Sequence, residues 1–152
     1  MGVYCTFHLV DEEEFKNVEY SNEELSDFLD DNLKLVEEGD AYYNPNTFCT
    51  SKYWIPSIFI INNQILKNSN LEIAHGKFHS LKDVCSITKK IEEVNLNMLK
   101  EIVFSSHFKI EHPYHQFDAN LDWLWIPGDF ETVKEAYSLA RESKKSIYIE
   151  VE

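Results

Sequence analysis

Residues 52–63 read Lys-Tyr-Trp-Ile-Pro-Ser-Ile-Phe-Ile-Ile-Asn-Asn, and from Tyr53 to Ile61 only Ser57 interrupts the apolar run. This is the longest nearly unbroken apolar run in the sequence. A run of this kind is typical of an element at the centre of a hydrophobic core, and we expect it between the acidic helix and the terminal strands described below. It carries no reactive side chain, so the function is expected elsewhere.

Two secondary structures compete for this run. Trp54, Ile58 and Ile61 follow the i, i+4, i+7 spacing of a helical stripe, whereas the isoleucines have the propensity of a strand. Pro56 fits the first turn of a helix and is poorly tolerated in a central strand. The pattern therefore favours a helix, and a strand is the open alternative.

Both ends of the sequence show the two-residue alternation of a β-strand. The alternating apolar positions are Val3, Cys5, Phe7 and Leu9 at one end and Ile147, Ile149 and Val151 at the other. We expect the two terminal strands to pair in one small sheet.

The acidic helix has a clear start signal. Ser21-Asn22-Glu23-Glu24 matches a capping box, and apolar residues follow at spacings of three and four as far as Val36. Gly39 is the predicted terminator, and residues 40–47 are predicted to form a loop.

Three further helices are predicted after the capping residues Ser80, Asn95 and Asp129, with a surface connection over residues 62–77 and an irregular segment over residues 107–125. The predicted fold is therefore α+β, with four to five helices packed around a small sheet. The length of 152 residues predicts one domain, residues 1–152.

The first residues, the lengths of the apolar runs and the cysteine spacing together predict a soluble cytoplasmic protein. The first residues do not resemble a secretory signal, and no apolar run approaches the roughly 18 to 20 residues that span a bilayer. Cys5, Cys49 and Cys85 are an odd number of widely spaced cysteines without a C-x-x-C pair, which predicts free thiols in a reducing compartment.

The negative charge is concentrated in one region. The net charge of the chain is −13. The stretch from Asp11 to Asp40 contains thirteen acidic residues and only two basic ones, Lys16 and Lys34, so it accounts for −11 of that charge. Such a surface repels phosphate backbones, so nucleic-acid binding is not expected. It suits a basic protein partner, and a solvated face that aids solubility is the alternative. The predicted interaction residues are Glu23, Asp27, Asp30, Asp31, Glu37 and Glu38.

The irregular segment 107–125 concentrates side chains with possible chemistry. An imidazole beside a carboxylate can act as an acid or base, and the candidate catalytic residues are His112, His115, Asp118 and Asp122. In a chain with many carboxylates such pairs also arise by chance. A second hypothesis is an aromatic pocket lined by Trp54, Tyr114 and Trp123.

Neither a metal nor a cofactor is predicted. His112-Pro113-Tyr114-His115 with Asp118 contains zinc-ligand types, but its spacing is not that of H-E-x-x-H, and the proline opposes a helix that would align both imidazoles. The sequence contains no P-loop, no G-x-S-x-G motif and no dinucleotide fingerprint.

Several features in this order give the chain a family resemblance: the Met-Gly start into a strand, a Lys52-x-Trp54-x-x-x-Ile58 segment, a Ser80-Leu81-x-x-Val84 helix, a His112-Pro113 turn and a closing helix with Phe130, Val133, Ala136, Tyr137 and Ala140. Together they resemble the YfbM-like family of uncharacterised bacterial proteins, the domain of unknown function 1877. The resemblance implies an α+β domain with both terminal strands in one sheet, and it implies no activity.

The leading hypothesis is therefore a bacterial protein-interaction module, of the immunity type, that masks a basic partner with its acidic helix. The alternative is a small hydrolase-like enzyme that uses the region of His112, His115 and Asp118. A structural or oligomerising domain is a third interpretation, and the sequence leaves the oligomeric state open.

Overall fold

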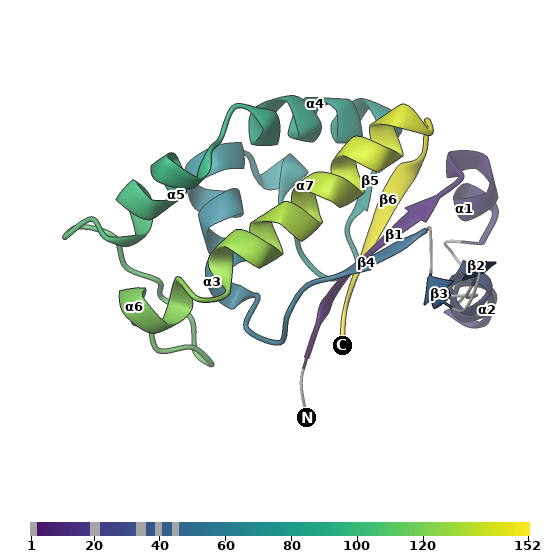
Figure 1. Ribbon diagram of the computed structural model, residues 1–152. Helices are drawn as coiled ribbons and strands as arrows, with labels where there is room; N and C mark the ends of the chain where they lie inside the picture. The colour runs from purple at the N-terminus through teal and green to yellow at the C-terminus, as the bar shows by residue number, and fades with distance from the viewer. Residues whose placement is uncertain (1–2, 19–21, 33–35, 39–40, 44–45) are drawn as a thin grey trace.

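Alternation of apolar residues builds a four-stranded antiparallel sheet from both ends of the chain (Figure 1). The computed structural model describes residues 3–18, 22–32, 36–38, 41–43 and 46–152. In order across the sheet, the strands are β4 (Thr47–Cys49), β1 (Cys5–Val10), β6 (Ser146–Val151) and β5 (Phe78–His79). The predicted α+β fold, with the terminal strands in one sheet, is confirmed.

Register places the apolar positions of the two terminal strands on one face. Phe7 pairs with Ile149 and Leu9 with Ile147, and all four side chains are buried. The opposite face carries His8 and Tyr148, which also form a pair. His8 is fully buried as well, so β1 is covered on both faces, as expected for a strand in the interior of a sheet.

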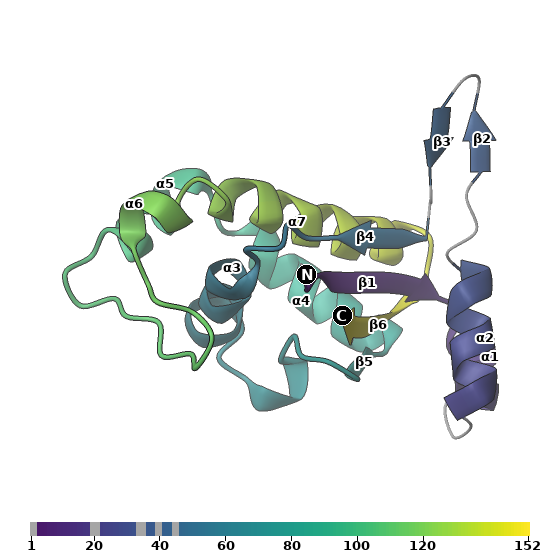
Figure 2. The ribbon, with the colours of Figure 1, turned by 90° about the horizontal axis from the view of Figure 1, so that it is seen from below.

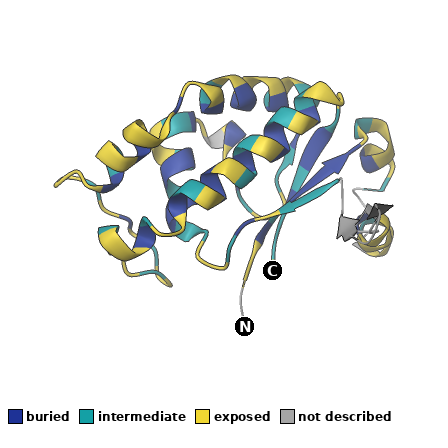
Figure 3. Cartoon of the chain, in the orientation of Figure 1, coloured by how far each residue is buried: buried dark blue, intermediate teal, exposed yellow. Residues whose placement is uncertain are grey.

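Helices α4 (Leu81–Glu92) and α7 (Ile126–Glu142) lie side by side over the apolar face of the sheet (Figures 1 and 2). The buried side of α7 contains two alanines, Ala136 and Ala140, which allow a close approach to its neighbours. The burial colours follow this packing, with dark blue turned inward along both helices (Figure 3).

The capping signals for two helices are confirmed. Ser80 and Asp83 form a reciprocal capping box at the start of α4. The side chain of Asn95 accepts a hydrogen bond from the backbone N–H of Met98 at the start of α5 (Leu96–Val103). The start predicted for α7 is wrong, because the helix begins at Ile126 and contains Pro127 in its first turn, where no N–H is needed.

The long apolar run is helical, as favoured. It forms α3 (Ile55–Ile60), with Pro56 in the first turn, and continues directly into a π-helix, η1 (Ile61–Leu66). Lys67 caps the π-helix in a left-handed conformation, with φ of 50° and ψ of 25°, and its backbone N–H donates to the carbonyl of Asn62. A short 3-10 turn, η2 (Ser69–Leu71), follows.

The predicted place of this run beside the acidic helix is wrong. α3 packs against α7 and η1 against α4, at the opposite end of the sheet from α1 and α2 (Figures 1 and 2). The apolar stripe that predicts burial does not specify the neighbouring element, which is set by the chain topology.

The acidic helix is shorter than predicted. α2 (Asn22–Asn32) is followed by a hairpin of β2 (Val36–Glu38) and β3 (Ala41–Tyr43), so the prediction of helix through Val36 and of a loop over residues 40–47 is wrong. The physical reason is that residues 36–38 pair with residues 41–43, and an apolar residue such as Val36 fits the spacing of a strand as well as that of a helix. The predicted cap Ser21 and terminator Gly39 lie outside the described residues.

A short helix before α2 covers the second face of the sheet. α1 (Glu12–Val18) buries Phe15, whose ring stacks on Phe78 at a centroid distance of 4.5 Å and contacts Tyr148 at 5.2 Å. Phe28 of α2 meets Phe15 edge-on, and Leu29 of α2 is buried. These aromatic contacts attach the acidic helix to the sheet.

The segment predicted to be irregular, residues 107–125, is irregular as far as Asp118 but not beyond it. Residues 104–118 contain a β-bridge between His112 and His115, followed by α6 (Ala119–Asp122). Within the part of the chain that the structure describes, no helix has the length and apolar character needed to cross a membrane.

Candidate functional site

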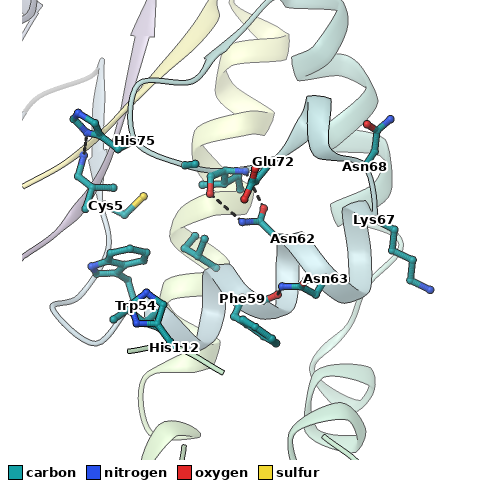
Figure 4. Close-up of a pocket in the computed structure, with 15 residues that line it drawn as sticks. Cys5, Trp54, Phe59, Asn62, Asn63, Lys67, Asn68, Glu72, His75 and His112 are labelled. Carbon is teal, nitrogen blue, oxygen red and sulfur yellow. Dashed lines mark hydrogen bonds between the residues drawn. The ribbon is translucent and has the colours of Figure 1, made fainter. Parts of the chain in front are cut away.

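A cleft of about 630 Å³ lies between α3, η1 and the segment 72–75, near the end of the sheet (Figure 4). We call it the apolar cleft. Its apolar lining comprises Cys5, Ile55, Ile58, Phe59, Ile73, Ala74 and Val151, and its remaining lining residues are Trp54, Asn62, Asn63, Lys67, Asn68, Glu72, His75 and His112. Its volume falls within the range of about 300 to 1,000 Å³ of small-ligand sites.

The π-helix fixes one wall of the apolar cleft. The side-chain amide of Asn62 donates to the carbonyl of Ile73 at 2.9 Å, and its oxygen accepts from the N–H of Ile73 at 2.8 Å. This double hydrogen bond ties residues 72–75 to η1. Ile73 is 2% exposed, so water can hardly replace either bond, and breaking them would be costly. The surface connection predicted over residues 62–77 is therefore wrong in its first part, because residues 62–66 belong to η1, and residues 72–75 form an anchored wall of the cleft.

Three heteroaromatic rings at the other end are oriented by backbone hydrogen bonds. The indole Nε1 of Trp54 donates to the carbonyl of Val3 at 2.9 Å. The Nδ1 of His75 accepts from the N–H of Val151 at 3.0 Å, and the Nδ1 of His112 accepts from the N–H of Tyr114 at 3.2 Å. A ring nitrogen that accepts carries no proton, so both imidazoles keep an N–H donor at Nε2.

Charged and nucleophilic groups contribute little to the apolar cleft. Only Lys67 and Glu72 among its lining residues carry a formal charge. Cys5 also lines it, but burial raises the pKa of its thiol to about 12, so Cys5 is not an activated nucleophile. The interior therefore suits an apolar group, with polar contacts at the margin.

A second, smaller hollow adjoins the apolar cleft at His75, which lines both. It has a volume of about 240 Å³ and lies between α2 and β6. We call it the acidic hollow, because three carboxylates and no lysine or arginine line it. Its lining residues are Leu25, Ser26, Leu29, Asp30, His75, Tyr148, Glu150 and Glu152.

Glu150 of the acidic hollow also contacts a buried histidine. The Nε2 of His8 lies 3.2 Å from a carboxylate oxygen of Glu150, and His8 is fully buried. Burial lowers the pKa of His8 more than Glu150 raises it. The neutral ring donates from Nε2 to Glu150, while its Nδ1 has no hydrogen-bond partner in the described part of the chain.

The four candidate catalytic residues are only partly brought together. The Nε2 of His115 lies 3.1 and 3.0 Å from the two carboxylate oxygens of Asp122, which is 6% exposed. Asp118 instead caps α6 by accepting from the N–H of Leu121 at 3.1 Å. His112 lines the apolar cleft, and the other three candidates do not.

The three aromatic residues predicted to share a pocket lie apart. Trp54 lines the apolar cleft, whereas Tyr114 is 87% exposed and is not part of that lining. Trp123 packs against the core and meets Phe104 edge-on at 6.1 Å. Of the three, only Trp54 is placed to contact a bound group in the apolar cleft.

The described side chains of the acidic surface are exposed. Glu23, Asp27, Asp30 and Asp31 of α2 all face solvent. Glu37 and Glu38 belong to β2, and their side chains lie outside the described residues. The predicted interaction surface is therefore described only on α2.

Two buried polar clusters hold the core together and stay outside the cleft. The carboxylate of Asp129 accepts from the backbone N–H of Ser51 at 2.7 Å and from its hydroxyl at 2.8 Å. Burial raises the pKa of Asp129, and these two bonds oppose that rise. The hydroxyl of Tyr137 lies 2.7 Å from the Nδ1 of His79 beneath α7.

Metal-ligand types do not gather at any point of the described chain. Among those residues, no three His, Cys, Asp or Glu side chains are placed to hold one metal ion. His75 and His112 line the same cleft, but each ring already accepts a backbone hydrogen bond at Nδ1.

Sequence patterns miss most of the apolar cleft. Phe59, Asn62, Ile73 and His75 come from segments that the sequence marks only as core helix or surface connection. The available signal is the Asn62-Asn63 pair directly after the apolar run, where polar residues interrupt a helix that is otherwise buried. That signal does not identify the segment that faces it.

Comparison of the chain with protein-family models, with curated proteins and with solved structures gives no match to any of them. The resemblance to the YfbM-like family stays a prediction from the sequence.

Proposed function

We propose that this chain is an acidic protein-interaction module, of the immunity type, that binds a basic partner protein through the exposed face of α2. The observation that carries the proposal is the charge of this helix. Glu23, Asp27, Asp30 and Asp31 are exposed, and residues 22–32 contain no lysine or arginine. Complementary charge accelerates the encounter with a basic partner and disfavours acidic ones.

The packing of α2 supports this role. Its apolar side is used internally, because Leu29 is buried and Phe28 contacts Phe15 of α1. The helix therefore presents its carboxylates from a fixed base on the sheet. Preorganised charges lose less conformational entropy on binding than charges on a mobile segment.

We further propose that the protein acts in the bacterial cytoplasm as a member of the YfbM-like family. All three cysteines lie in the described part of the chain and are free thiols, with Cys49 and Cys85 exposed. Exposed free thiols suit a reducing compartment. The family assignment is supported by the sequence resemblance alone.

Crosslinking in cells, followed by affinity measurement with the recovered partner, tests the proposal. Reversal of Glu23, Asp27, Asp30 and Asp31 to lysine is expected to weaken binding at least about tenfold at low salt, because several complementary charges are lost together. The matched control reverses four exposed acids elsewhere, namely Glu93, Glu101, Glu111 and Glu135.

The affinity of the wild-type protein should also fall as salt is raised, since exposed charges are screened. Failure to recover any partner, or an equal loss of affinity in the two fourfold variants, would contradict a role for α2.

A hydrolase-like activity is the second candidate function, and the His115–Asp122 pair favours it. The carboxylate within 3.0 Å of Nε2 orients the ring and leaves Nδ1 as the atom that would take a proton. A panel of ester, amide and phosphate substrates tests this candidate. Turnover that is lost in His115→Ala and kept in His107→Ala would support it, whereas equal background rates in both variants would exclude it.

A further inference from the structure

We propose that the apolar cleft and the acidic hollow together bind one extended peptide segment of the partner, with an apolar side chain in the cleft and a Lys or Arg side chain in the hollow. This inference rests on the proposed function, because it names the part of the basic partner that the acidic face recruits.

The two depressions adjoin at the end of β6. Val151 lines the apolar cleft, Glu150 and Glu152 line the acidic hollow, and His75 lines both. Successive side chains of a strand point to opposite faces, so the depressions open on the two faces of the sheet end. A peptide that fills both therefore passes over His75, whose exposed side chain covers this edge of β6.

His75 is built as a contact point for such a peptide. Its Nδ1 accepts from the backbone N–H of Val151, which orients the ring at this edge (Figure 4). The Nε2–H remains as a donor, and the side chain is exposed. A donor in this position suits the carbonyl of a crossing main chain.

The interior of the apolar cleft favours an apolar side chain. Phe59 and Ile73 contribute apolar surface, and the amide of Asn62 and the indole N–H of Trp54 already have backbone partners. Entry of an apolar group therefore leaves none of these polar atoms unpaired, and buried apolar area stabilises the complex.

The acidic hollow favours one cationic side chain. Asp30, Glu150 and Glu152 supply its carboxylates, and none of its lining residues is a lysine or arginine. Its volume of about 240 Å³ lies below the range of whole small-ligand sites, so it suits a single side chain. Because Asp30 also belongs to the exposed face of α2, the hollow continues the surface proposed to attract the partner.

Fluorescence anisotropy with labelled, end-capped hexapeptides and the full chain tests the inference. One peptide position is Leu, another is Lys, the spacing between them varies from one to three residues, and the other positions are Gly or Ser. We expect saturable binding with a Kd below about 1 mM for at least one spacing. Replacement of Leu or of Lys by Ala is expected to weaken it about fivefold to tenfold each.

Protein variants locate the binding. Asp30→Asn with Glu152→Gln removes two carboxylates from the acidic hollow, and Asp27→Asn with Asp31→Asn removes two from α2 outside it. Both pairs change the net charge equally. We expect the first pair to weaken the peptide about threefold to tenfold and the second less than about twofold.

Two changes probe the apolar cleft in opposite directions. Phe59→Ala removes apolar contact, and Ala74→Trp fills the cleft, so both are expected to weaken the peptide about tenfold. Leu124→Ala, at an exposed side chain outside the lining, is the control and should bind normally. Thermal melting of each variant identifies any that fail to fold, and the pair of opposite changes keeps the test informative.

Three results would overturn the inference: no binding by any hexapeptide, equal effects of the two charge pairs, or equal binding by a free alkylamine that lacks a peptide backbone. A natural partner that depends on Asp27 and Asp31 but not on Phe59, Asp30 or Glu152 would keep the proposed function and reject this peptide site. The proposed function itself is tested separately, by the fourfold charge reversal on α2, and it fails if that variant binds the partner as well as the wild-type protein does.

Discussion

At the scale of the residue, His79 shows how burial fixes a protonation state. The side chain is fully buried, with Nδ1 2.7 Å from the Tyr137 hydroxyl and Nε2 3.2 Å from the carbonyl of Glu72. A carbonyl only accepts, so Nε2 carries the proton and Nδ1 accepts from Tyr137. Desolvation lowers the pKa of His79 to about 4.

This lowered pKa predicts a loss of stability in acid. Above about pH 6.5 His79 is neutral in both states, whereas between about pH 6.5 and pH 4 only the unfolded chain binds the proton. The free energy of unfolding should therefore fall by about 3 kcal/mol across this window. Urea titrations at pH 7, 5.5 and 4.5 measure it.

His8, whose pKa is also lowered by burial, contributes to the same decline, so a variant is needed to separate the two. His79→Gln cannot titrate and should be less stable at pH 7 but show a shallower decline. The same slope in wild type and variant would contradict this account of His79.

At the scale of the element, the π-helix η1 is the feature that forms the wall of the apolar cleft. The amide of Asn62 attaches it to Ile73, and its neighbour Asn63 makes one exposed bond to the carbonyl of Phe59 at 2.9 Å. π-helical turns inside longer helices are uncommon and frequently lie at functional sites.

Removal of the Asn62 amide should therefore destabilise the protein more than removal of the Asn63 amide. Asn62→Ala leaves both backbone groups of the buried Ile73 unpaired, at an expected cost of about 2 kcal/mol. Asn63→Ala is the matched control and should cost less than about 1 kcal/mol. Denaturant titration of the two variants measures the difference, and equal costs would show that the double bond to Ile73 does not hold this wall.

Local sequence patterns predict some elements of this fold well. They fail where contacts with distant residues decide whether a segment is a helix or a strand. The alternation of Phe7 and Leu9 predicts β1, and the reciprocal chemistry of Ser80 and Asp83 predicts the start of α4. Val36 continues the helical spacing of α2 yet lies in β2, because the same apolar residue fits either period and its strand partner is needed to decide.

The candidate site is harder to predict for the same reason. His115 and Asp122 lie close in sequence, and their pairing follows a local pattern. The apolar cleft joins residue 5, residues 54–75, His112 and Val151, segments that only the fold brings together. The sequence marks the charge of α2 but gives no sign of the hollow between α2 and β6.

At the scale of the whole molecule, α2 and α3 stand at opposite ends of the sheet, and the end of β6 lies between them (Figure 2). This arrangement places acidic groups and an apolar cleft on either side of His75. A short partner segment that carries both a cationic and an apolar side chain can therefore occupy the two adjoining depressions at once.

The most direct test is a titration of the isotopically labelled full chain with the best Leu-Lys hexapeptide, followed by amide chemical shifts in two-dimensional NMR. The account predicts shifts that saturate together at Asp30, His75 and Phe59, with smaller changes at Asp27 and Asp31. Shifts confined to the outer face of α2, or no saturable shifts at the peptide concentrations that the anisotropy requires, would contradict it.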